Sequence, residues 1–245
     1  MRNLLIVLGT LLFGALACRN QSPKDARALA ARGWELHRQG DIAGAIAAFD
    51  QAIAVDPNEP LLYHHRANAR VSAGEFDLAM ADWERALSLG LNAPQLYSNR
   101  GRARVLHGDS AGALADYNKA LSLDPDYANA YNNRGYLRQA QGDVDGALGD
   151  YERAIVLNPG DPYFYSNRAS ARLAKGDAGG AASDLEKAIA MDSTNAEGFC
   201  NTGLLAIFQR RAADAEAAFQ RCYGLDPKLK PRFERQRRII EHSIR

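Results

Sequence analysis

The sequence predicts an all-α fold built from repeated pairs of helices. An aromatic residue returns about every 34 residues through much of the chain, at Tyr63, Tyr97, Tyr131, Tyr165 and Phe199. When the sequence is written in rows of this length from Ala26, six rows follow one another to Leu229 with no insertion or deletion. Self-similarity at a fixed period is the signature of a repeat protein, in which each unit packs on the next.

Small and bulky residues stand in constant columns of these rows. A small column holds Gly33, Ala67, Gly101, Gly135, Ala169 and Gly203, and a bulky column holds Phe49, Trp83, Tyr117, Tyr151, Leu185 and Phe219. Within a row the apolar residues recur at spacings of three and four, which is typical of a helix with one buried face. The columns therefore predict where helices pack.

Turn residues divide each row into two helices. A glycine followed by an acidic residue breaks the first five rows midway, beginning with Gly40-Asp41. Glycine can take the left-handed conformation that ends one helix, and an acidic residue suits the N-terminus of the next. Four rows close on Asp-Pro or Asn-Pro, because proline cannot continue a helix. One row is therefore predicted to be a helix hairpin.

The rows are about 34 residues long, and in this they resemble tetratricopeptide repeats. The small residue of the first helix, the alanine and aromatic columns of the second and the closing proline resemble the same family. The resemblance implies a right-handed α-solenoid of six hairpins, at 26–59, 60–93, 94–127, 128–161, 162–195 and 196–229. The closing proline is missing at "SLGLN" and "AMDST", and the Gly-Asp break is missing at "FQRRAAD". Residues 230–245 resemble the helix that caps such a stack.

The N-terminal segment predicts export. In residues 1–17, Arg2 precedes an apolar run that is shorter than the roughly 20 residues of a membrane-spanning helix and typical of a signal peptide. The letters "ALAC" resemble a bacterial lipobox, in which Cys18 is lipidated and 18–25 forms a linker. Ala15-Leu16-Ala17 also forms an ordinary cleavage site, but a cysteine directly after the cut favours lipidation.

These signals predict a location in the bacterial cell envelope. Arg19 rather than aspartate follows Cys18, which in Gram-negative lipoproteins implies the periplasmic face of the outer membrane. The alternative is a soluble periplasmic or secreted protein.

Two columns of opposite charge predict structural ion pairs. Arg66, Arg100, Arg134 and Arg168 stand in one column, and Asp82, Asp116, Asp150 and Asp184 stand in a later column of the same rows. The sixth row replaces both partners, by Thr202 and Ala218, whereas the first row keeps Arg32 opposite Ala48. Pairing within a row fits these exchanges better than pairing with the preceding row, so each guanidinium is expected to bind the carboxylate of its own hairpin.

The first helices also carry a column of asparagines, at Asn99, Asn133, Asn167 and Asn201. No column of charged residues is present or absent in the same rows as these asparagines. In the tetratricopeptide family this part of the helix lines the concave face, so the resemblance implies a peptide-binding groove that also includes Asn68, Arg102 and Tyr136. An amide offers a donor and an acceptor to an extended peptide backbone. Alternatively, the asparagines only solvate a polar inner face.

The groove departs from the carboxylate clamp of chaperone-binding tetratricopeptide domains. Around Asn133 the clamp positions hold Ser98, Arg102, Tyr163 and Asn167, so the cations of the clamp are missing apart from Arg102. Capture of an acidic C-terminus is therefore not expected.

Cys200 and Cys222 are predicted to be small unpaired thiols, with a disulfide as the alternative in an exported protein. No phosphate loop, nucleophile motif or metal-spaced set of histidines and cysteines occurs, and adjacent His64 and His65 diverge on a helix. We therefore expect no enzymatic activity, no metal, no cofactor and no small-molecule substrate.

The net charge and the composition limit the classes of partner that this protein is expected to bind. The net charge is +1 and the pI is about 7.7, which does not mark a nucleic-acid-binding protein. The tail from Lys228 holds seven Lys/Arg against two Glu, which suits an acidic partner, a lipid surface or simply the outer face of a capping helix. We expect a non-catalytic, membrane-tethered scaffold for a protein or peptide. The alternative is a structural accessory, similar to pilotins, of an outer-membrane secretion or pilus machine.

Overall fold

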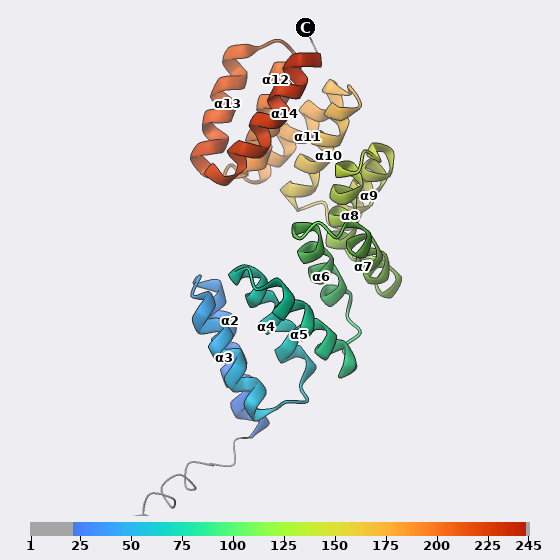
Figure 1. Ribbon diagram of the computed structural model, residues 1–245. Helices are drawn as coiled ribbons and strands as arrows, with labels where there is room; N and C mark the ends of the chain where they lie inside the picture. Colours follow the sequence, from blue (N-terminus) through green and yellow to red (C-terminus); the bar gives the residue numbers. More distant parts are fainter. Residues whose placement is uncertain (1–21, 244–245) are drawn as a thin grey trace, which may run out of the picture. The chain divides into compact units, whose positions relative to one another are not determined.

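The computed structural model describes residues 22–243 and confirms the all-α prediction for that range (Figure 1). The first helices are α2 (Pro23–Arg38), α3 (Ile42–Val55), α4 (Pro60–Ala73), α5 (Phe76–Ser88), α6 (Pro94–Leu106) and α7 (Ser110–Leu123). The later helices are α8 (Ala128–Ala140), α9 (Val144–Leu157), α10 (Pro162–Ala174), α11 (Ala178–Met191), α12 (Ala196–Phe208), α13 (Ala212–Leu225), the 3-10 turn η1 (Pro227–Leu229) and α14 (Lys230–Ser243). Each row of the sequence thus holds two helices.

The chain divides into two compact units, the first ending at Ala103 and the second beginning at Arg104. The predicted signal segment and Cys18 lie outside the described residues. None of the helices in residues 22–243 is both long enough and apolar enough to cross a lipid bilayer.

The predicted linker at 18–25 is too long at its C-terminal end, because α2 already begins at Pro23. The backbone N–H of Ser22 donates to Oδ2 of Asp25 at 2.7 Å, and Pro23 occupies the first helical turn. A proline there sacrifices no helical hydrogen bond, and an acidic residue three positions after the N-cap favours initiation. The first helix therefore starts shortly before the first row.

The mid-row turns form as the glycine and aspartate predict. Gly142 has a φ of +88°, and the carboxylate of Asp143 accepts a hydrogen bond of 2.9 Å from the backbone of Gly146 at the start of α9. In the sixth row, which lacks the glycine, Arg210 takes the same left-handed region with a φ of 60°. The turn geometry is kept where the preferred residue is absent, at a cost in backbone strain.

In the first unit, the bulky column lies in the interface between paired helices. Phe49 and Trp83 are essentially buried, and Phe49 packs with Ala45 and Ala69. A Cβ atom at Gly33 would stand only 2.8 Å from Cε1 of Phe49, so the small column is required by the close approach of α2 to α3.

The second unit repeats this packing and adds the C-terminal helix. A Cβ atom at Gly135 would meet the ring of Tyr151 at 2.9 Å, and one at Gly203 would meet Phe219 at the same distance. The first helices α8, α10 and α12 contact one another in that order, and α14 packs on α12 (Figure 1). Phe233 of α14 is 1% exposed and joins the core around Phe219.

Candidate functional site

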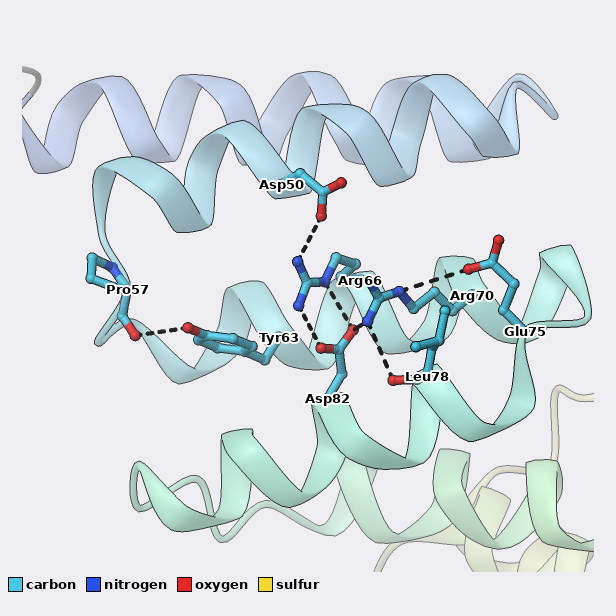
Figure 2. A network of polar contacts seen from close by, with 8 residues as sticks. All are labelled: Asp50, Pro57, Tyr63, Arg66, Arg70, Glu75, Leu78 and Asp82. Carbon is cyan, nitrogen blue, oxygen red and sulfur yellow. Dashed lines mark hydrogen bonds and ion pairs between the residues drawn. The ribbon is translucent and has the colours of Figure 1, made fainter.

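The structure brings together three of the four predicted arginine–aspartate pairs, each within its own hairpin. In the second row, Arg66 donates from Nε and Nη2 to the two carboxylate oxygens of Asp82, at 2.9 and 2.6 Å (Figure 2). Arg134 binds Asp150 and Arg168 binds Asp184 through the same two donors, at 2.6–2.9 Å. The fourth predicted pair, Arg100 with Asp116, joins residues of different units and stays a prediction.

A second arginine, which the sequence reasoning did not identify, shares each carboxylate. Arg70 donates from Nη1 to Oδ2 of Asp82 at 2.7 Å and to the carbonyl oxygen of Leu78 at 3.3 Å (Figure 2). The equivalent bonds to Asp116, Asp150 and Asp184 come from Arg104, Arg138 and Arg172. The signal was present in the sequence, because these arginines occur only in the four rows that hold the aspartate.

The networks also reach the preceding hairpin. Nη1 of Arg66 donates to Asp50 of α3 at 2.6 Å, and Nη1 of Arg134 donates to Oδ1 of Asn118 in α7 at 2.7 Å. Burial alone would lower the pKa of Arg66, but the hydrogen bonds to Asp82 and Asp50 outweigh it, so its pKa is raised. The arginine therefore stays charged and ties together three helices, which is a structural role.

In the first unit, the predicted groove residues Asn68, Asn99 and Arg102 lie on α4 and α6. Asn68 is half-buried, and its Nδ2 lies 3.3 Å from Nε2 of His64 on the same helix. Asn99 is half-buried and Arg102 is exposed.

Two histidines of α4 belong to the interior of this unit. Nδ1 of His64 accepts a hydrogen bond from Nε1 of Trp83 at 3.3 Å, which requires a neutral ring. Burial lowers the pKa of His64 to about 4, helped by the neighbouring His65, and burial likewise lowers the pKa of His65 to about 4. The half-exposed Trp34 packs edge-on against His65, with ring centroids 4.7 Å apart. This cluster is part of the packing of the unit.

In the second unit, the predicted asparagines do not form a uniform ladder of exposed amides. Nδ2 of Asn167 donates to Oδ1 of Asn132 at 2.9 Å, and Nδ2 of Asn201 donates to the carbonyl oxygen of Ser166 at 3.0 Å. Asn201 is only 3% exposed, so its assignment to an open groove is corrected. Its Nδ2 instead bridges α12 to the backbone of α10, and these two helices contact each other.

The other two groove residues of this unit lie on α8. Asn133 is half-buried, whereas Tyr136 is 41% exposed and contributes to the wall of a cavity. Of the predicted groove residues in the second unit, Tyr136, Asn167 and Asn201 therefore surround one site, to which α14 also contributes.

Two cavities lie where α14 faces the first helices of the hairpins. The smaller, of about 160 Å³, is lined by Tyr136, Gln139, Ala140, Asn167, Ser170, Asn201, Arg232, Phe233 and Gln236. The larger, of about 520 Å³, has a mostly apolar wall that includes Leu173, Leu204, Phe208 and Ile239. Its volume lies in the range of about 300–1,000 Å³ that is usual for ligand pockets. Together these cavities are the candidate functional site of the second unit.

The prediction that Cys200 and Cys222 are unpaired is wrong, because the structure joins them in a disulfide between α12 and α13. Their Cα atoms lie 5.2 Å apart, within the range of about 4.4–6.8 Å that a disulfide spans. Both cysteines are fully buried at the packed interface of the last hairpin. The small-residue columns bring the two backbones together, and that approach could be judged only from the folded hairpin.

The comparisons with known proteins agree with this geometry. A family model described as TPR repeat matches residues 33–74 and 101–142, and one described as tetratricopeptide repeat matches 128–161. No curated protein sequence matches the chain.

Several solved structures share the fold. PilF of Pseudomonas aeruginosa is 18% identical with a TM-score of 0.71, over 84% of this chain and 94% of that chain. PilW, described as a widely conserved type IV pilus biogenesis factor, is 22% identical with a TM-score of 0.70, over 85% and 94%. YrrB, described as a TPR protein with an unusual peptide-binding site, is 22% identical with a TM-score of 0.53, over 71% and 90%. At these identities the likeness shows the fold alone. The matched repeats identify the chain as a tetratricopeptide repeat protein.

Proposed function

We propose that this protein is a non-catalytic scaffold of the bacterial cell envelope, which binds an extended peptide segment of a partner protein along the first helices of its hairpins. Tetratricopeptide repeat proteins bind peptide or protein partners, which is the general basis of the proposal. The observation that carries it here is the pair of cavities between α14 and the helices α8, α10 and α12, with Tyr136 exposed at their edge.

The disulfide supports a location outside the cytoplasm. Disulfides persist in oxidising compartments such as the periplasm and are rare where thiols are kept reduced. The pairing of Cys200 with Cys222 is independent of the N-terminal sequence, yet it agrees with the export signal predicted there. We therefore retain Cys18 as the proposed lipid anchor and the periplasmic face of the outer membrane as the proposed location.

A peptide array probed with the purified protein tests the binding function. The proposal expects reproducible hits that weaken when Tyr136→Ala or Asn133→Ala is introduced on α8. Val156→Ala is the matched control, because Val156 is a 71% exposed apolar residue of α9 outside the cavity walls. An array with no hits, or hits that respond equally to all three variants, would contradict the proposal.

Membrane attachment needs a separate experiment. Cell fractionation combined with mass measurement of the mature N-terminus is expected to find a diacylated Cys18 in the membrane fraction, and Cys18→Ala is expected to release the protein. Two or more acyl chains are enough for stable attachment, whereas one is marginal. An unmodified Cys18 in a protein that is already soluble would establish ordinary signal cleavage instead.

The second candidate function is an accessory part in the assembly of an outer-membrane secretion or pilus machine. It is favoured by the fold shared with PilF and PilW, each of which aligns over 94% of its own length. Co-purification with an oligomeric membrane complex, combined with an array that yields no peptide, would favour this accessory role over the peptide-binding scaffold.

A further inference from the structure

Three residues that line one cavity each hold a buried polar atom without a hydrogen-bond partner. Oδ1 of Asn201, Nε of Arg232 and Oε1 of Gln236 are each buried and unbonded, and all three residues line the cavity of about 160 Å³. Buried polar atoms are almost always paired, since an unpaired one costs roughly 1–3 kcal/mol. Three of them at one cavity indicate a place for a polar group.

Gln139, Ser170 and Asn167, which also line this cavity, are hydrogen-bonded within the protein. Gln139 donates to Oγ of Ser170 at 3.0 Å and accepts from the hydroxyl of Tyr151 at 3.1 Å. Nδ2 of Asn201 is committed to Ser166, which fixes the orientation of its amide and leaves the oxygen as the unbonded atom. The unpaired atoms therefore do not reflect a generally loose arrangement.

The set of unpaired atoms defines the chemistry of the occupant. Two acceptors, on Asn201 and Gln236, require N–H donors, whereas Nε–H of Arg232 requires an acceptor. The charge of Arg232 is already paired, because its Nη2 binds Glu197 at 2.7 Å. A carboxylate would face two acceptor oxygens, and an ammonium group has no acceptor for Arg232. A neutral peptide bond supplies both N–H and C=O.

The adjoining cavity adds a side-chain preference. The two cavities share Gln139, Ser170 and Gln236 as walls, so an occupant of the polar cavity borders the apolar one. The apolar cavity, of about 520 Å³, is walled by Leu173, Leu204, Phe208 and Ile239 among others. An apolar side chain placed there would be removed from water, which is favourable in proportion to the buried area.

We propose that α14 is part of the binding site, where Asn201, Arg232 and Gln236 hold one peptide bond of an extended partner segment while its large apolar side chain fills the neighbouring cavity. This inference rests on the proposed peptide-binding function. It adds that the site beside α14 selects a partner residue with a large apolar side chain. α14 thereby contributes two of the three recognition groups.

A minimal probe tests the inference on the purified protein. N-acetyl-L-leucine N-methylamide carries one apolar side chain between two amide groups. Titration is followed by ¹H–¹⁵N NMR signals of the Asn201 and Gln236 side-chain amides and of Arg232 Nε–H. Saturable shifts of all three signals are expected. N-acetyl-L-leucine, with a free carboxylate, and the alanine analogue are expected to bind at least several-fold more weakly.

Matched variants separate the site from general effects. Gln236→Leu is expected to weaken binding by about threefold to tenfold, which corresponds to one lost hydrogen bond. Gln220→Leu, at an exposed position of α13, should leave the affinity unchanged. Ala174→Leu, at the wall of the apolar cavity, should abolish binding, whereas Ala190→Leu, at a different cavity, should not.

Three outcomes would overturn the inference. If no signal shifts saturably, the unpaired atoms are satisfied by ordinary water alone. If the free carboxylate binds equally well, the occupant is not required to be an amide. If Gln236→Leu binds the probe like the wild type, α14 is not part of the binding site. These results are distinguishable from failure of the proposed function. Array peptides that respond to Asn133→Ala but not to Gln236→Leu would preserve that function while removing this site.

Discussion

Arg138 donates to Oδ2 of Asp150 at 2.8 Å, the same oxygen that already accepts from Nε of Arg134 at 2.9 Å. The carboxylate of α9 is 4% exposed and is thus held by two arginines that stand one helical turn apart on α8. Two cations share one buried anion, so the loss of the aspartate is expected to be more harmful than the loss of either arginine.

Asp150→Ala is therefore expected to lower the free energy of unfolding by about 3–5 kcal/mol, because breaking a buried ion pair leaves uncompensated charge behind. The cost should be much smaller when Arg134 and Arg138 are already alanine. Urea denaturation of the cycle of variants measures the coupling. Asp126→Ala is the control, since the exposed pair of Asp126 with Arg153 should contribute less than about 1 kcal/mol. Additive effects across the cycle would refute the network.

Arg210→Gly is expected to stabilise the second unit by about 1 kcal/mol, because an ordinary residue loses roughly that amount when it occupies the left-handed region. Arg210 has a φ of 60°, where the corresponding position of the preceding row holds Gly176 with a φ of +80°. The reciprocal change, Gly176→Ala, should destabilise by a similar amount. Both are measured as shifts of the urea midpoint at constant slope. A midpoint that falls in Arg210→Gly would show that the arginine side chain contributes more than its backbone costs.

Reduction of the disulfide is expected to lower the stability of the last hairpin by about 3 kcal/mol, the amount that closing a loop of this length removes from the entropy of the unfolded chain. The loop runs from Cys200 to Cys222, a separation of 22 residues. Thermal unfolding with and without a thiol reductant measures the effect. The variant with both cysteines changed to alanine should not respond to the reductant. A wild-type protein equally indifferent to it would show that the cysteines are unpaired in solution.

The first unit is expected to lose stability as the pH falls from about 6.5 to about 4. The folded-state pKa values of His64 and His65 are lowered to about 4 by burial, so within this window the unfolded chain binds more protons than the folded one. Each histidine would cost about 3 kcal/mol if its full shift were realised. Below pH 4 both states are protonated and the loss stops.

Tryptophan fluorescence measures this loss in the first unit, because Trp34 and Trp83 are the two tryptophans of the chain. His64→Gln, which cannot take up a proton in this range, should remove about half of the pH dependence. A variant that keeps the full dependence would assign the titration to other groups.

The repeat period, the helix pairs and the charge columns were readable from the sequence, because each follows from local chemistry that recurs from row to row. A glycine followed by an acidic residue ends the first helix of a row, as at Gly142, and a column that needs a small residue shows itself by repetition. The pairing of Arg134 with Asp150 followed from the joint loss of both partners in the sixth row. The second arginine, Arg138, was equally readable, since its column is confined to the rows that hold the aspartate.

The irregular features depended on the tertiary structure, since they arise at the last hairpin, where repetition ends. The spacing of Cys200 and Cys222 allowed either state, and the 5.2 Å between their Cα atoms is a property of packed helices. Asn201 shares a column with Asn133, yet it is buried, since the neighbouring helix accepts its amide and α14 lies over the same cavity. A column predicts that side chains occupy equivalent positions on their own helices, but what covers each of them is decided by elements distant in sequence.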